Sequence, residues 1–252
     1  MKAIILLAVI ALAIAGCNDD TQPAPIVIDD NELVIDDSVP KTPEQNVVES
    51  SGDNALNQEL AGLMRRQMTM NYHIEYDMKI SSGPVQQDMK ATYYVSSDGR
   101  IRVDTLMQGI ESRSYVLGDN YYTCTLIMGA WNCMDYSSIP VGDSVEQVDE
   151  ESIAIIEQGV VSRLPPKTVA GVTSNCYRAV IGMGTMDYCY TPEGIPVYVK
   201  SMQEFEGMTT ESEMIATSIS RSIPSGVFDL PSSPTAYEDM DYEDLIKQYQ
   251  MQ

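Results

Sequence analysis

The sequence predicts a mostly β (α+β) domain whose main element is a strongly curved antiparallel sheet of about ten strands. Residues 68–81 alternate between apolar and polar side chains with the period of a half-buried strand. From residue 88 to residue 223, short segments of similar character are separated by turns rich in Gly, Asp and Asn. Only two stretches carry the spacing of amphipathic helices, one before the strands and one inserted among them.

The first helix is expected at residues 54–67, where four apolar side chains share one stripe: Leu56, Leu60, Leu63 and Met64. The strand at residues 68–81 follows, with an apolar phase of Met68, Met70, Tyr72, Ile74, Tyr76, Met78 and Ile80. Successive strand side chains point to opposite faces, so this phase forms one surface. This surface is built from Met and Tyr instead of the usual Val and Leu. It can either pack into a permanent protein core or contact a ligand that binds and leaves.

Further strands are expected at residues 88–96, 100–108, 110–117, 121–127 and 130–135. An inserted helix at residues 145–158 turns Ile153 and Ile156 inward, and strands resume at residues 168–181, 185–191, 195–205 and 208–223. Short connections between successive strands imply antiparallel neighbours, so the strands form a meander that curves into an open sheet or a partial barrel.

Four cysteines lie within the strands: Cys124, Cys133, Cys176 and Cys189. The first two are symmetric about Met128-Gly129, and the last two about Gly182-Met183. Each pair would therefore face across its own hairpin, and we expect two structural disulfides, Cys124–Cys133 and Cys176–Cys189. Zinc is the alternative, but no CxxC occurs and the single His lies in another strand, so no metal site is expected.

The N-terminus has the features of a secretory signal. Lys2 precedes an apolar run, residues 3–15, that is short for a membrane span. The run ends in Ile14-Ala15-Gly16-Cys17, which resembles the lipobox of secreted lipoproteins. That resemblance implies cleavage after residue 16 and a diacylglyceryl group on Cys17. A plain secretory peptide and an uncleaved anchor helix are the alternatives; the small residues before Cys17 and the polar tract after it favour lipidation.

Acidic segments flank the domain in a chain whose net charge is −22. Beyond Cys17, a tether up to residue 53 carries ten acidic residues against one Lys, and its four prolines favour disorder. The expected domain covers residues 54–234, and residues 235–252 form an acidic tail or helix. This balance argues against nucleic acid and against attraction to anionic headgroups.

No catalytic constellation emerges from the sequence. His73, the only His, lies on the polar phase of the first strand as an ordinary surface residue, and no GxSxG, HExxH or glycine-rich phosphate loop occurs. A two-carboxylate hydrolase stays open, but no carboxylate pair stands out. We therefore expect a protein that is not an enzyme and has no cofactor.

The order of elements resembles the LolA/LppX-like lipoprotein-carrier superfamily over about residues 54–234. The resemblance is carried by ATYYVSSDGRIRV (residues 91–103), YYTC (121–124), GAWNC (129–133) and the closing GVFDLP (226–231). It implies a half-barrel whose concave face, lidded by helices, holds acyl chains. Carriers of this kind shuttle freely, whereas this chain is expected to be tethered. Shuttling between membranes is therefore not expected of this chain, and no functional residue of the carriers is assigned to it.

The candidate ligand-contacting residues follow from the Met and Tyr surface of the first strand together with that resemblance. They are Met70, Tyr72, Ile74, Tyr76, Met78, Met89, Tyr93 and Val95, with Ala91 among them. Met accepts varied apolar shapes, whereas a core of fixed packing would use more Phe than the two in this chain. The expected function is that of an extracytoplasmic lipoprotein of the cell envelope that binds a lipid or other hydrophobic ligand. The alternative is an interaction or sensory lipoprotein with a self-filled core and another envelope protein as its partner.

Overall fold

The computed structural model describes residues 54–138, 150–182, 184–205 and 208–237. All described residues belong to the second of the chain's two units, Ser51–Gln252. The signal peptide, Cys17 and the tether predicted from the sequence therefore lie outside the described residues, as do residues 238–252 of the tail. Within the described ranges, no helix combines the length and the apolar character needed to cross a membrane.

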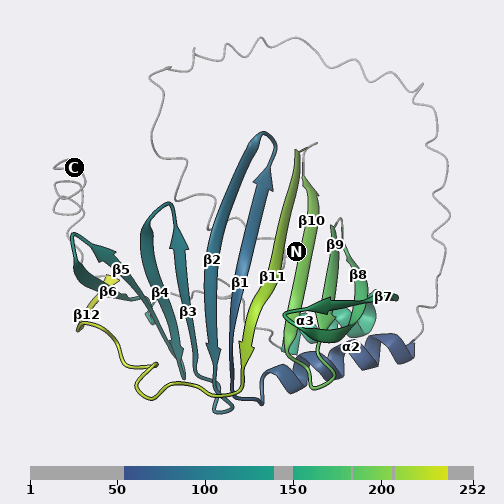
Figure 1. The fold of residues 1–252 in the computed structure, drawn as a ribbon, viewed down its shortest axis with the longest axis horizontal. Helices are drawn as coiled ribbons and strands as arrows, with labels where there is room; N and C mark the ends of the chain where they lie inside the picture. Colours follow the sequence, from purple (N-terminus) through teal and green to yellow (C-terminus); the bar gives the residue numbers. More distant parts are fainter. Residues whose placement is uncertain (1–53, 139–149, 183, 206–207, 238–252) are drawn as a thin grey trace, which may run out of the picture. The chain divides into compact units, whose positions relative to one another are not determined.

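Two helices and twelve strands make up the described part of the chain (Figure 1). The helices are α2 (Asn54–Gln67) and α3 (Glu150–Gln158). The strands are β1 (Tyr72–Ser82), β2 (Val85–Val95), β3 (Ile101–Met107), β4 (Ile110–Leu117), β5 (Asn120–Ile127), β6 (Ala130–Asp135), β7 (Val160–Val169), β8 (Val172–Ile181), β9 (Gly184–Tyr190), β10 (Pro196–Phe205), β11 (Met208–Ser220) and β12 (Pro234–Ala236).

All twelve strands belong to one sheet with the order β12-β6-β5-β4-β3-β2-β1-β11-β10-β9-β8-β7. Two antiparallel meanders, β1 to β6 and β7 to β11, meet where β1 pairs with β11, and only the short β12 runs parallel to its neighbour. The expected fold class, a mostly β domain with an open, curved antiparallel sheet and two helices, is confirmed.

Both helices pack against one face near the β7 edge of the sheet (Figure 1). Their buried side chains, Leu60, Ala61, Leu63, Met64, Ile153 and Ile156, meet Tyr177, Ala179, Tyr188 and Tyr190 of the sheet. The Asn57 side-chain amide donates hydrogen bonds to the carbonyl oxygens of Glu157 and Gly159, which joins α2 to the end of α3. We call the side that carries these four sheet residues the helix-bearing face. The predicted inward residues of both helices are confirmed.

Strand register assigns the other side chains to the two faces, because directly paired residues lie on the same side of a sheet. A row on the helix-bearing face runs through Met89, Met78, Met214, Val199, Tyr188 and Tyr177. One residue further along, the opposite face carries alternating charges: Asp88, Lys79, Glu213, Lys200, Asp187 and Arg178. Lys79, on the polar phase of β1, thus belongs to a row of charged residues on this face.

Residues 221–233, which we call the strap, cross the opposite face between the end of β11 and β12 (Figure 1). Arg102 donates from Nη1 to the carbonyl oxygen of Val227 at 2.7 Å, and Leu230 packs against the cluster around Tyr115. His73 Nδ1 lies 2.8 Å from the carbonyl oxygen of Ser222. The closing GVFDLP segment is therefore a structural brace over β3 and β4.

The sequence prediction was wrong at one edge of the sheet. The single strand expected at residues 168–181 is two strands, β7 and β8, that turn at Ala170 and Gly171. Most of β7 was missed because Pro165 and Pro166 argue against a strand; β7 accommodates them as an edge strand, with a register shift between Leu164 and Lys167. The three-residue β12 was missed as well. β1 begins at Tyr72, four residues later than its alternation suggested.

Candidate ligand-binding face

The structure places the predicted ligand-contacting residues together on the helix-bearing face. Register pairs Tyr72 with Val95, Ile74 with Tyr93, Tyr76 with Ala91 and Met78 with Met89. Met70 precedes β1 and packs against the same core cluster. Met70 and Tyr93 are partly buried, whereas the others are buried. The set thus forms one continuous surface with two ends. Tyr72 and Tyr76 lie at the tyrosine end and Met78 and Met89 at the methionine end, and the side chains at the two ends are held by different contacts.

The tyrosine end is fixed by contacts within the protein. Tyr76 is 3% exposed, and its hydroxyl donates a 2.6 Å hydrogen bond to the carbonyl oxygen of Pro196. The Tyr76 ring meets Tyr93 edge to face, with centroids 5.4 Å apart. Tyr72 is 1% exposed, and burial raises the pKa of its hydroxyl. The Tyr76 hydroxyl is therefore committed to the backbone.

The methionine end offers softer, less directional packing. Met89, Met78 and Met214 stand side by side on β2, β1 and β11, and each is buried. The neighbouring row contains Ile80, Ser212, Ser201 and Met186. Unbranched thioether side chains can repack around apolar groups of varied shape. This end of the face has the chemistry expected where an apolar chain is accepted.

Ser201 is a polar exception within that apolar end. It is 2% exposed, and its Oγ has no hydrogen-bond partner among the described residues. A buried hydroxyl without a partner is costly and uncommon, so it calls for a specific explanation. The sequence reasoning missed Ser201 because only the register between β9, β10 and β11 places it beside Met186 and Ser212.

Beyond β2 the middle of the helix-bearing face carries mostly small polar side chains, between an apolar row at Ile101 and Val116 and another at Met107 and Ile110. Two rows cross β3 to β6: Val103, Ser114, Thr123 and Met134 in one, and Thr105, Ser112, Thr125 and Asn132 in the other. None of these residues is buried, and the helix contacts with the sheet are concentrated at β7 and β8. Thr105 and Ser112 share a 2.8 Å hydrogen bond. An apolar surface thus borders a polar platform on the same side of the sheet.

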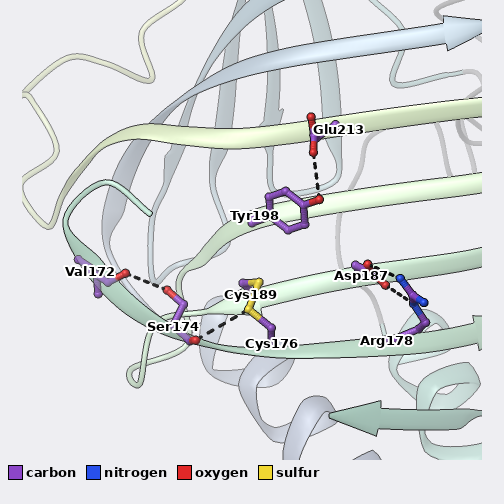
Figure 2. The surroundings of a disulfide bond; sticks show 8 residues. All are labelled: Val172, Ser174, Cys176, Arg178, Asp187, Cys189, Tyr198 and Glu213. Atoms are coloured by element: carbon purple, nitrogen blue, oxygen red, sulfur yellow. Dashed lines mark hydrogen bonds and ion pairs between the residues drawn. A yellow bond between two sulfur atoms is a disulfide. The ribbon is translucent and has the colours of Figure 1, made fainter. Parts of the chain in front are cut away.

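Both predicted disulfides are present, Cys124–Cys133 and Cys176–Cys189. Figure 2 shows the second one between β8 and β9, with the Arg178–Asp187 ion pair further along the same strands. Register places both bridges on the face opposite the helices. Two disulfides in one small domain are typical of an oxidising, extracytoplasmic compartment.

The described residues contain no group of three or more His, Cys, Asp or Glu side chains that could hold a metal ion. The His73 ring lies tilted against Tyr94, with ring centroids 5.6 Å apart, and its Nδ1 contacts the strap. These contacts place His73, expected from the sequence to be an ordinary surface residue, beside the strap on the face opposite the helices.

We expect the protein to lose stability between pH 10 and pH 12. Burial first, and then the 2.7 Å hydrogen bond to Glu59, raise the pKa of Tyr177 to about 12. Burial also raises the pKa of Tyr190 well above 10.0. The fold thus favours the neutral phenols, so their contribution is complete below pH 10 and is lost as the pH rises through the folded pKa values.

Urea unfolding at a series of pH values, read together with tyrosinate absorbance, measures this loss. Tyr177→Phe removes one titrating group, so its stability should depend less steeply on pH across the same interval. A free energy of unfolding that stays constant from pH 9 to pH 12 would contradict the assignment.

The described residues define the class: a β protein with one open antiparallel sheet, two disulfides and one face partly covered by helices. No family model and no curated protein sequence matches the chain. Among solved structures it is similar to MucB, with 14% identity and a TM-score of 0.47 over 71% of this chain and 63% of MucB. The chain thus spans less than two thirds of the length of MucB.

Two further solved structures cover similar shares of the chain. An uncharacterized conserved protein from Thermus thermophilus has 9% identity and a TM-score of 0.45, over 71% of this chain and 96% of that one. A putative outer membrane lipoprotein-sorting protein domain from Vibrio parahaemolyticus has 8% identity and a TM-score of 0.33, over 70% and 97%. At these identities the likeness concerns the fold alone.

Proposed function

We propose that this protein is a membrane-anchored, extracytoplasmic lipoprotein that binds a lipid or another hydrophobic ligand on the helix-bearing face, in lipid or lipoprotein handling and without catalysis. The observation that carries the proposal is the pairing of two features at one place. Met78, Met89 and Met214 form an apolar surface across three adjacent strands, and the buried Ser201 hydroxyl beside it has no partner among the described residues.

The chemistry of this place suits an acyl chain with a polar end. Each CH₂ group of the chain buried against the methionines contributes about 0.8 kcal/mol to binding. The Ser201 hydroxyl can donate to an ester or carboxyl oxygen, which would satisfy it in the bound state. The hydroxyl rows of β3 to β6 give a polar segment of the ligand a place on the same face.

Two variants of β3 test where the ligand lies. Thr105 points to the helix-bearing face, and Leu106, the next residue, points to the opposite face and is exposed. Thr105→Trp should obstruct the face and weaken binding of a fluorescent fatty acid at least about tenfold, a loss of about 1.4 kcal/mol. Leu106→Trp is the matched control and should bind the probe like wild type. Equal binding by both variants would contradict the proposed location.

Ser201→Ala separates a ligand contact from a structural role. Removing a buried hydroxyl that lacks a partner should leave the free energy of unfolding unchanged or slightly higher. The same change should weaken probe binding by about two- to tenfold, because one hydrogen bond is lost. A variant that is destabilised and yet binds the probe normally would show that the hydroxyl serves the fold instead.

The burial of the tyrosine end favours a second candidate, an envelope interaction or sensory lipoprotein whose core is filled by its own side chains. Tyr72, Ile74 and Tyr76 are at most 3% exposed, as in an ordinary core. Such a protein would take an envelope protein as its partner and would bind no fatty-acid probe.

The anchor is proposed at Cys17, outside the described residues. We expect wild-type protein to stay in the membrane fraction and to carry a lipid-sized mass increment on its N-terminal Cys. Cys17→Ala should accumulate as an unlipidated precursor, whereas Asn18→Gln should be processed like wild type. Recovery of processed wild-type protein wholly in the soluble fraction would contradict the anchor.

A further inference from the structure

The large apolar side chains that are exposed among the described residues gather at one end of the sheet. They are Val85, Leu106, Ile110, Met128, Val160, Val180, Met202, Met208 and Ile215. All except Ile215 and Val160 lie in or close to one of five turns, β1–β2, β3–β4, β5–β6, β8–β9 and β10–β11. Val160 pairs with Val180, which lies beside the β8–β9 turn. Antiparallel pairing puts these five turns at the same end, at the top of the sheet for β1–β2, β3–β4 and β10–β11 in Figure 1. We call this edge the hairpin end.

Three of the five turns at the hairpin end carry no charge. Residues 81–87, 126–131 and 179–185, which contain three of its five turns, include no charged residue in a chain of net charge −22. At the other end, the turns after β2, β4 and β9 each carry an acidic residue: Asp98, Asp119 and Glu193. Of the remaining two turns at the hairpin end, β3–β4 is followed by Glu111 and β10–β11 is preceded by Glu204, and at the other end Asp98 and Glu193 pair with Arg100 and Arg221. The exposed apolar side chains, and not the net charge, therefore distinguish the hairpin end.

We propose that the hairpin end docks on a lipid bilayer with uncharged or zwitterionic headgroups, with the turns entering the interface. Strands about 4.8 Å apart spread the apolar side chains along the whole edge of the sheet. A bilayer is a continuous apolar medium that can accept all of them at once, whereas a compact protein partner would cover a few. Without Lys or Arg in the three uncharged turns, this edge has no attraction for anionic headgroups.

Met128 is the most exposed of these side chains, at 80%. It occupies the β5–β6 turn with φ at 52°, a left-handed conformation that Asp and Asn accept more readily than Met. An apolar side chain thus occupies the tip of the β5–β6 turn, although Asp or Asn would fit this backbone conformation better.

The only Trp of the chain, Trp131, follows this turn directly and reports on docking without a label. The full-length protein is reconstituted into phosphatidylcholine vesicles whose acyl chains carry bromine, and Trp131 fluorescence is measured. We expect quenching in wild type. Met128→Asp suits the left-handed turn and places a charge at the tip, so it should lose most of the quenching. Asn120→Asp adds the same charge at the opposite end of the sheet and should be quenched like wild type.

Unquenched Trp131 in reconstituted wild-type protein would overturn the proposal, and so would equal quenching of the two variants. Sedimentation that shows a dimer broken by Met128→Asp, with no quenching, would assign the hairpin end to self-association instead. The result is separable from ligand binding. A protein that binds the fatty-acid probe but is not quenched contradicts only the docking, and one that is quenched but binds no probe contradicts only the proposed function.

Discussion

Replacing Cys176 and Cys189 together by Ala is expected to lower the free energy of unfolding by about 3 kcal/mol. The bridge closes a loop with a sequence separation of 13, for which the chain-entropy model gives about 2.9 kcal/mol. Both cysteines are at most 1% exposed and belong to the main core cluster, so the lost sulfur packing adds to this effect. Urea unfolding of the oxidised wild type and the double variant measures the difference.

The Cys124–Cys133 bridge allows a comparison of the two stability losses. Cys124 and Cys133 have a sequence separation of 9 and lie in a smaller cluster near β12, so their replacement should cost about 2.6 kcal/mol in the same model. The Cys176–Cys189 bridge also joins β8 to β9, on which both helices pack, so its loss should loosen the helices as well. A wild-type unfolding midpoint that does not change when both bridges are reduced would contradict this account of stability.

Arg102→Met is expected to cost about 2–3 kcal/mol and to release the strap. Arg102 is 8% exposed, pairs with Asp104, and lies 5.3 Å from the ring centroid of Tyr94 and 5.6 Å from that of Tyr115. Its Nη1 holds the Val227 carbonyl. Removing one partner of a mostly buried ion pair leaves the other uncompensated. The Asp104 side chain is 28% exposed, so water offsets part of this cost.

Arg100→Met is the matched control, because Arg100 also contacts the strap, with its guanidinium 4.6 Å from the ring centroid of Phe228. Its side chain is 45% exposed, so the expected loss is below about 1 kcal/mol. Limited proteolysis should cut Arg102→Met within residues 221–233 faster than either wild type or Arg100→Met. Equal cleavage of all three proteins would show that Arg102 does not hold the strap.

Much of this architecture can be predicted from local patterns. Alternation in β1 assigned its faces correctly, because burying one side of a sheet fixes the register. The positions of the cysteines about their turns predicted both bridges, since direct cross-strand neighbours are close enough to bond. Apolar spacing predicted α2 and the inward residues of α3, because each helix has a single apolar stripe.

The remainder depends on contacts between distant segments. β7 contains two prolines that local rules exclude from a strand interior, and only its place at the edge of the sheet makes them acceptable. The hydrogen bond from Tyr76 to Pro196 joins residues 120 apart in sequence, so nothing near Tyr76 indicates it. The same holds for Ser201, whose burial among Met186 and Ser212 follows from three strands in register.

The central claim, a hydrophobic ligand on the helix-bearing face, is tested most directly by native mass spectrometry of full-length protein extracted gently from its membrane. We expect wild type and Leu106→Trp to carry a noncovalent lipid in addition to the covalent lipid proposed at Cys17, and Thr105→Trp to lack the noncovalent one. Wild-type protein that carries only its covalent lipid, and that acquires no fatty acid when one is supplied in excess, would contradict the claim.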